Sequence, residues 1–162
     1  MSEPRIPWTH QPTGRTDGRD RRARSSERLA LLADTPLFDG LAKSQLRRIA
    51  KVSGARTFGP GDELVKEGVP GRVFYIVVEG QAKIVRRGRT IGRAGPGDSF
   101  GEMAILTTAP RSASVVAETS MEVVTLSGIH LRAILLEQPR IAVRLLDTLA
   151  TRLADLDRRF TA

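Results

Sequence analysis

The sequence contains no cysteine, few aromatic residues and no long apolar run, and each of these gaps excludes a class of protein. Without cysteine the chain can form no disulfide, no thiol nucleophile and no thiolate-held zinc or iron–sulfur centre. Its two histidines, His10 and His130, lie too far apart in sequence to suggest a His-based metal site, so we expect no metal. No segment approaches the roughly 20 apolar residues of a membrane span, and the N-terminus lacks the apolar stretch of a signal peptide. We therefore expect a cytoplasmic protein with no membrane partner.

Length and charge limit the number of domains and the class of ligand that the chain can have. The 162 residues suit a single domain of roughly 100–200 residues. Lys and Arg number 26 against 18 Asp and Glu, which gives a net charge of +8. This excess favours an anionic ligand or surface but does not select one.

Residues 1–28 differ from the rest of the chain, with seven Arg, four acidic residues and only four apolar ones. So little apolar surface cannot offset the entropy of ordering, and we predict a flexible basic tail here. One alternative is that the tail binds DNA, with an affinity that falls steeply with salt. Because Asp17, Asp20 and Glu27 dilute the arginine run at positions 19, 21, 22 and 24, and no aromatic residue is interleaved in that run, we do not expect nucleic acid as the partner.

The domain itself is predicted to occupy residues 29–162. Helical spacing of apolar residues from Ser26 to Val52 predicts two short helices. From about residue 55 to 127, short Val- and Ile-rich runs alternate with Gly and Pro turn signals, which predicts eight strands of an antiparallel jelly-roll barrel. The clearest strand, Val73 to Val78, is followed by Gly80 and an alternating segment from Ala82, as in a hairpin.

Residues 128–160 return to helical spacing, with a break at Pro139. In the last helix the apolar residues recur at alternating spacings of about three and four, which is typical of a coiled-coil seam. The seam comprises Ala142, Leu146, Leu149, Leu153, Leu156 and Phe160. It either packs against its own barrel or pairs with a second copy in a homodimer.

The stretch from Gly95 to Ala117, GPGDSFGEMAILTTAPRSASVVA, carries the most chemical information. A single helical turn beginning at Glu102 would direct free backbone N–H groups at an anion. The planar fork of Arg111 matches two phosphate oxygens at once. Glu102 is explained if the ligand also presents hydroxyl donors, as a ribose does. The simpler alternative is that Glu102 and Arg111 form a salt bridge with each other.

Three segments of this stretch, Phe100-Gly101-Glu102, Met103-Ala104 and Pro110-Arg111-Ser112-Ala113, resemble the phosphate-binding cassette of the cyclic nucleotide-binding domain family. The likeness extends from about residue 30 to residue 160, and includes Pro36-Leu37-Phe38, Pro60-Gly61-Asp62, Glu67-Gly68 and Phe74-Tyr75-Ile76-Val77-Val78-Glu79-Gly80. It implies a mainly β jelly roll flanked by N-terminal helices and a C-terminal helix.

The resemblance also implies a site, formed by Gly101, Glu102, Met103, Ala104, Arg111 and Ser112. Arg111 would pair with the exocyclic phosphate oxygens, and Glu102 would accept a hydrogen bond from the ribose 2′-hydroxyl. Backbone N–H groups of Gly101 and Ala104 and the hydroxyl of Ser112 would complete the contacts. Glycines at 61, 80, 97 and 101 would occupy turns or close approaches.

The function implied is a cyclic nucleotide sensor, with cAMP favoured over cGMP, that has no attached output domain and acts on an unidentified downstream protein. Base specificity stays open, because Leu156 and Asp157 stand where bacterial activators of this family place hydroxyl side chains against adenine.

Two other functions would be compatible with parts of the sequence. Gly97–Gly101 fits the G-x-S-x-G pattern of a serine hydrolase, with Glu118 or Glu122 and then His130 following. The turn at Gly95-Pro96 and the short chain argue against it, so we expect no enzyme. The second is a ligand-free jelly roll that serves as a scaffold or assembly module. Intact Glu102 and Arg111 argue against that.

Overall fold

This computed structural model describes the backbone of residues 18–161. Residues 1–17 of the predicted tail, which spans residues 1–28, lie outside the described residues. Helix α1 (Gly18–Ala33) occupies the remainder of that segment and begins before the Ser26 start that the apolar spacing predicted. Arg and Ala are good helix formers, which is why the helix extends beyond the apolar repeat.

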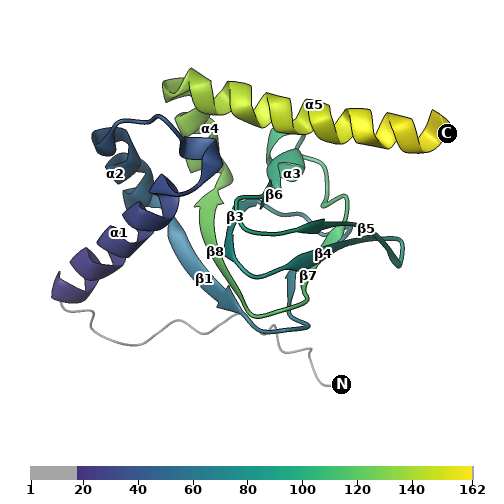
Figure 1. The fold of residues 1–162 in the computed structure, drawn as a ribbon, viewed down its shortest axis with the longest axis horizontal. Helices are drawn as coiled ribbons and strands as arrows, with labels where there is room; N and C mark the ends of the chain where they lie inside the picture. Colours follow the sequence, from purple (N-terminus) through teal and green to yellow (C-terminus); the bar gives the residue numbers. More distant parts are fainter. Residues whose placement is uncertain (1–17, 162) are drawn as a thin grey trace.

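Within residues 18–161, eight strands form two four-stranded antiparallel sheets, which confirms the predicted jelly-roll class (Figure 1). Their order is β1-β8-β3-β6 in one sheet and β2-β7-β4-β5 in the other. The strands are β1 (Gly54–Phe58), β2 (Glu63–Val65), β3 (Val73–Glu79), β4 (Ala82–Arg86), β5 (Arg89–Ala94), β6 (Ser99–Phe100), β7 (Ser114–Ala117) and β8 (Met121–Ser127).

The continuous apolar run of β3 is explained by burial on both of its faces. Phe74 and Ile76 belong to a core cluster shared with the helices, and both are fully buried. Tyr75 and Val77 point to the opposite side and join a second cluster between the sheets. Because successive side chains of a strand alternate between faces, a strand between two cores has no polar alternation.

The predicted hairpin between Val73–Val78 and the segment from Ala82 was wrong. Strand β3 pairs with β6 and β8, whereas β4 pairs with β5 and β7 in the other sheet. The chain crosses between the sheets at Gly80 (φ +88°), where a Cβ would lie 2.2 Å from the Ser120 carbonyl oxygen. The hydrogen-bonded hairpin is β4–β5, turned by Arg87 and Gly88, both with positive φ.

Helices α1, α2 (Lys43–Val52) and α4 (Gly128–Glu137) lie to one side of the sheet that contains β1, β8 and β3, and α5 (Pro139–Thr161) runs across one end of the jelly roll (Figure 1). The turn η1 (Pro36–Phe38) and helix α2 follow α1, and α3 (Glu102–Leu106) follows β6. Helices α4 and α5 are separated at Gln138, which confirms the predicted break at Pro139. Within residues 18–161, no helix is both long and apolar enough to span a membrane.

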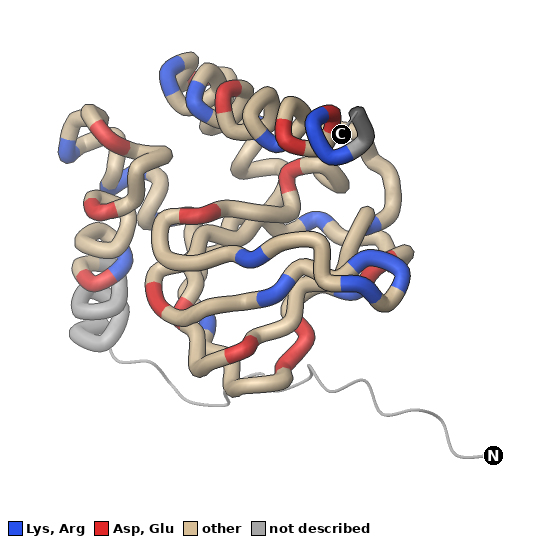
Figure 2. Tube along the Cα trace, turned by 45° about the vertical axis from the view of Figure 1, so that its right-hand side comes forward, with Lys and Arg blue, Asp and Glu red and all other residues tan. Residues whose placement is uncertain are grey.

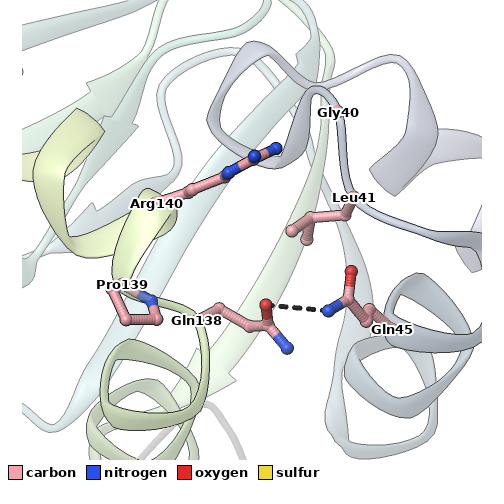
Figure 3. A pocket seen from close by; sticks show the side chains of 6 residues that line it. All are labelled: Gly40, Leu41, Gln45, Gln138, Pro139 and Arg140. Atoms are coloured by element: carbon pink, nitrogen blue, oxygen red, sulfur yellow. Dashed lines mark hydrogen bonds between the residues drawn. The ribbon is translucent and has the colours of Figure 1, made fainter.

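A set of polar contacts joins α2 to the junction of α4 and α5. Gln45 Nε2 donates a hydrogen bond to Gln138 Oε1 over 3.0 Å, across a cavity of about 330 Å³ (Figure 3). Beside it Arg48 forms an ion pair with Glu137 at 3.4 Å. These contacts attach the end of α4, where α5 begins, to helix α2.

The apolar residues of α5 divide between two faces. Ile141 and Leu145 are buried in the core, and Leu149 packs against it. Leu146 and Leu153 are 63% and 61% exposed. The predicted seam is therefore split, because Leu149 turns toward its own jelly roll while Leu146 and Leu153 face outward; the side chain of Phe160 is not among those described. The homodimer remains a prediction.

Candidate functional site

The stretch between β6 and β7 folds as a tight cassette. Gly101 caps α3 with φ +96°, a left-handed conformation that favours glycine. A Cβ at this position would lie 2.6 Å from the Val73 carbonyl oxygen and 2.8 Å from Arg111 Nη1. The single helical turn predicted from Glu102 is confirmed as α3. Gly61, Gly80 and Gly97 also have positive φ, as predicted for turns.

Arg111 is a buried residue of this cassette and is only 8% exposed. Its Nη1 donates to the Gly101 carbonyl at 3.1 Å and its Nη2 to the Val73 carbonyl at 2.8 Å. Its backbone is held as well, since its N–H donates to the Val69 carbonyl and its own carbonyl accepts from the Gly68 N–H. The two side-chain bonds occupy two of the five guanidinium donors and so fix the group while leaving donors for a ligand.

Burial lowers the pKa of the Arg111 guanidinium below its ordinary value, because desolvation penalises the charged form. The neighbouring Tyr75 and Glu102 act in the opposite direction and partly restore the pKa. Arginine remains protonated at neutral pH. A desolvated cation held in place without a full counter-ion is suited to binding a monoanion such as a phosphodiester.

Gly71 provides the space that Arg111 occupies. A Cβ built on Gly71 would lie 2.0 Å from Arg111 Nε and 2.5 Å from its Cζ, so any larger residue would displace the guanidinium. In the sequence Gly71 is only one of the Gly and Pro turn signals between the predicted strands, so this role was not predicted. Nothing in the local sequence could have shown it, because Gly71 and Arg111 are distant in the chain.

Glu102 is the second buried charge of the cassette and is only 3% exposed. Its Oε1 accepts a hydrogen bond from Arg152 Nη1 of α5 at 2.7 Å. Its Oε2 is buried with no hydrogen-bond partner among the described residues. The ion pair of Glu102 is thus with Arg152, and not with Arg111 as the simpler alternative had it. Leaving a buried carboxylate oxygen unpaired costs free energy, so this atom is suited to a donor from a ligand.

The remaining predicted site residues line the same loop with different exposure. Ala104 is buried, whereas Met103 is 47% exposed and Ser112 is exposed. The Ser112 carbonyl accepts a hydrogen bond from Arg86 Nε of β4 at 2.9 Å, which ties the end of the cassette to the β4–β5 hairpin. The structure therefore brings Gly101, Glu102 and Arg111 together as predicted.

The prediction missed Arg152, which approaches Glu102 from 50 positions further along the chain. Its Nη2 also donates to the Ser99 carbonyl. A cavity of about 260 Å³ borders these groups, and its lining includes Arg152, Ser99 and Thr148. One feature of the sequence could have indicated this contact. Arg152 follows Leu145 and Leu149 at helical spacing, so a charged residue stands where the side of α5 that faces the jelly roll would otherwise continue with an apolar one.

The hydrolase pattern does not have the context it requires. Ser99 pairs with Ile76 inside an antiparallel strand and is buried, whereas a nucleophilic serine should lie at the tip of a sharp turn. His130 is exposed on α4, where its N–H donates to the N-cap Ser127.

Charge is distributed over the described surface with both signs mixed. Basic positions lie at the β4–β5 hairpin, and along α5 they are interspersed with acidic ones (Figure 2). Within residues 18–161, no three His, Asp or Glu side chains gather as a metal ion would require. The buried charges of the cassette, rather than a broad basic face, are what distinguish this site.

Comparison with known proteins agrees with this geometry. The family model described as the cyclic nucleotide-binding domain matches residues 55–138. A CRP-like cAMP-activated global transcriptional regulator of Mycobacterium tuberculosis is 34% identical over 128 residues, which are 76% of this chain and 57% of the regulator. A cGMP-dependent protein kinase of Toxoplasma gondii is 40% identical over 93 residues, which are 57% of this chain and 9% of the kinase.

Among solved structures, the catabolite activator protein of Thermus thermophilus superposes with a TM-score of 0.70 and 32% identity. The superposition covers 78% of this chain and 62% of that protein. The chain spans less than two thirds of the length of each of these relatives. With a family model that matches over half of its residues, the chain belongs to the cyclic nucleotide-binding domain family.

Proposed function

We propose that this chain binds a cyclic nucleotide in the cassette of residues 101–112 and acts as a sensor, with cAMP preferred over cGMP. The observation that carries the proposal is the pair of buried charges. Arg111 is held by two carbonyls with donors to spare, and Glu102 keeps one oxygen unpaired. A ligand with one phosphodiester charge and one adjacent ribose hydroxyl would satisfy both.

In this proposal each site residue has a separate role. Arg111 donates to the exocyclic phosphate oxygens, and the backbone N–H of Ala104 adds to that contact. Glu102 Oε2 accepts from the ribose 2′-hydroxyl, and Met103 and the Ser112 hydroxyl lie at the edge of the site. Each charge-assisted hydrogen bond would contribute about 1.5–3 kcal/mol. The role is one of binding, with no catalytic step and no metal.

The preference for cAMP follows a relative that matches 76% of this chain and whose name is that of a cAMP-activated regulator. The cGMP-dependent kinase among the relatives makes cGMP the ligand to compare. The signal would leave through α5 to an unidentified cytoplasmic protein, or to a second copy that pairs with the outward row containing Leu146 and Leu153. Nucleic acid and membrane are not part of the proposal.

Calorimetric titration with cAMP and cGMP tests the proposal directly. We expect saturable binding of cAMP to the parent protein, near-abolition in Arg111→Leu and clear weakening in Glu102→Ala. Arg89→Leu is the matched control, since it removes the same charge from an exposed position on the β4–β5 hairpin. If neither nucleotide at millimolar concentration produces heat or a thermal shift, the ligand-free scaffold is the correct function.

A further inference from the structure

The β4–β5 hairpin concentrates positive charge at its tip. Residues 80–97 contain five basic residues and no acidic one. Arg86 and Arg89 lie directly opposite each other across the hairpin, and Arg87 and Gly88 form the two-residue turn between them. Basic positions gather on this hairpin in Figure 2. We call Arg86, Arg87 and Arg89 the arginine tip.

The charges of the arginine tip are not neutralised within the protein. None of its three guanidinium groups forms an ion pair with a carboxylate of the described residues. Further along the same hairpin the situation differs, since Arg93 forms an ion pair with Glu118 at 2.9 Å. The tip is therefore the part of the hairpin whose cations are available to a partner.

Two hydrogen bonds hold the tip in place without using this capacity. Arg86 Nε donates to the Ser112 carbonyl at 2.9 Å, which fixes the side chain and leaves Nη1 and Nη2 free of any partner among the described residues. Glu67 Oε2 accepts from the backbone N–H of Arg87 at 3.0 Å, so this carboxylate contacts the main chain of the turn rather than a guanidinium. Glu67 offsets at most one of the three charges.

The arginine tip lowers the stability of the hairpin in two ways. Arg87 has φ +50°, a left-handed conformation in which a two-residue turn prefers Asn, Asp or Gly. Arg86 and Arg89 place like charges directly opposite each other, which is unfavourable. Charges on an edge strand can prevent aggregation, but residue 87 belongs to neither strand. Backbone preference and protection of the edge therefore do not explain this arginine, which favours a role in binding.

We infer that the arginine tip is a docking surface for an acidic segment of a partner protein. This inference goes beyond the proposed function and does not depend on nucleotide binding. The planar guanidinium group matches the two oxygens of a carboxylate, and an acidic partner relieves the repulsion between Arg86 and Arg89.

The surroundings of the tip favour a short acidic stretch of polypeptide over a long polyanion. Nucleic acids and anionic membranes present many charges, and their binding requires a broad basic surface. Here carboxylates flank the hairpin, with Glu67 at the turn and Glu118 beside Arg93. The unpaired positive charge is thus confined to the tip.

The first test measures binding of a fluorescein-labelled oligoglutamate peptide by fluorescence anisotropy in the absence of nucleotide. We expect saturable binding that weakens as salt rises, and no binding of an oligoglutamine peptide of the same length. Replacing the tip with Arg86→Gln, Arg87→Asn and Arg89→Gln together should weaken the glutamate peptide at least about tenfold, because removing one exposed ion pair weakens binding by up to about fivefold.

The matched control removes three exposed positive charges from elsewhere, by Arg47→Gln, Lys51→Gln and Arg56→Gln. These residues lie on α2 and on β1 of the other sheet. We expect this variant to bind the glutamate peptide within about twofold of the parent, since local contacts rather than net charge determine binding. Equal weakening by the two triple variants would overturn the inference. So would tighter binding of a short DNA duplex or of phosphatidylserine vesicles than of the peptide.

A separate comparison distinguishes this inference from the proposed function. Arg89→Leu, the control of the nucleotide titration, should weaken the glutamate peptide and leave cAMP binding unchanged. A parent that binds the peptide but no cyclic nucleotide would refute the proposed function alone, and one that binds cAMP but no peptide would refute the docking surface alone.

A second measurement needs no binding probe. Arg87→Asn introduces a residue that favours the left-handed turn and removes one of the repelling charges, so the urea midpoint should rise, and rise less at high salt. Arg56→Gln, which removes one exposed charge from β1, should leave the midpoint unchanged. A lower midpoint for Arg87→Asn would show that this arginine stabilises the fold, and the inference would be wrong.

Discussion

Gly71→Ala is the most direct test of how the cassette holds its cation. The substitution adds one carbon atom in a loop, and the backbone at Gly71 is not in the left-handed region, so it introduces no conformational strain of its own. The new Cβ would lie 2.0 Å from Arg111 Nε, whereas an ordinary contact begins near 3.4 Å. The guanidinium must therefore move by about 1.4 Å.

A movement of that size is incompatible with hydrogen bonds of 2.8 and 3.1 Å to the Val73 and Gly101 carbonyls. The displaced Arg111 would also lose alignment with a bound phosphate. Each charge-assisted hydrogen bond contributes about 1.5–3 kcal/mol, and tenfold in affinity corresponds to about 1.4 kcal/mol. We therefore expect cAMP binding to weaken about 10- to 100-fold, with unfolding destabilised by only about 1–3 kcal/mol.

The assay is calorimetric titration of cAMP, accompanied by circular dichroism and urea unfolding to show that the variant is folded. Gly59→Ala is the matched control, because its Cβ would meet Asp62 Oδ2 at an ordinary 3.6 Å and its φ is not left-handed. We expect it to bind as the parent does. An affinity of Gly71→Ala within threefold of the parent would refute the reasoning that the observed position of Arg111 determines phosphate binding.

Three further predictions concern stability and assembly. Gly101→Ala should cost at least about 1–2 kcal/mol in urea unfolding, because φ is +96° and a Cβ would approach the Val73 carbonyl; an unchanged midpoint would contradict this. Leu153→Asp should leave the monomer's stability within about 0.5 kcal/mol, whereas Leu149→Asp should destabilise it more, because only Leu149 packs on the core. In sedimentation, a dimer in the parent and a monomer in Leu153→Asp would support pairing through α5, and a monomer in both would make the homodimer prediction wrong. Ser127→Ala should cost about 1 kcal/mol, because its Oγ accepts the His130 N–H at the start of α4; a urea midpoint equal to the parent's would argue that the cap is not needed.

Most of the strand and helix pattern was accessible from the sequence, because it depends on neighbours along the chain. Gly and Pro signals separated the strands, and the run from Gly101 to Leu106 predicted α3. The sequence predicted the segments of β3 and β4 correctly as strands, but the prediction that they pair in a hairpin was wrong, because they belong to different sheets. Turn chemistry specifies that the chain reverses, but it does not specify which strand becomes the partner.

The sequence by itself determined the fold class through its strand and turn pattern, and it pointed to the cassette and its two charged groups through the resemblance to the cyclic nucleotide-binding domain family. Only the tertiary structure decided that Gly71 makes room for Arg111, that Leu149 faces the core, and that Arg152 pairs with Glu102. These contacts join residues 40 to 50 positions apart or depend on the rotation of a helix against a sheet. They follow from how the layers pack around the buried charges, and no local pattern encodes that packing.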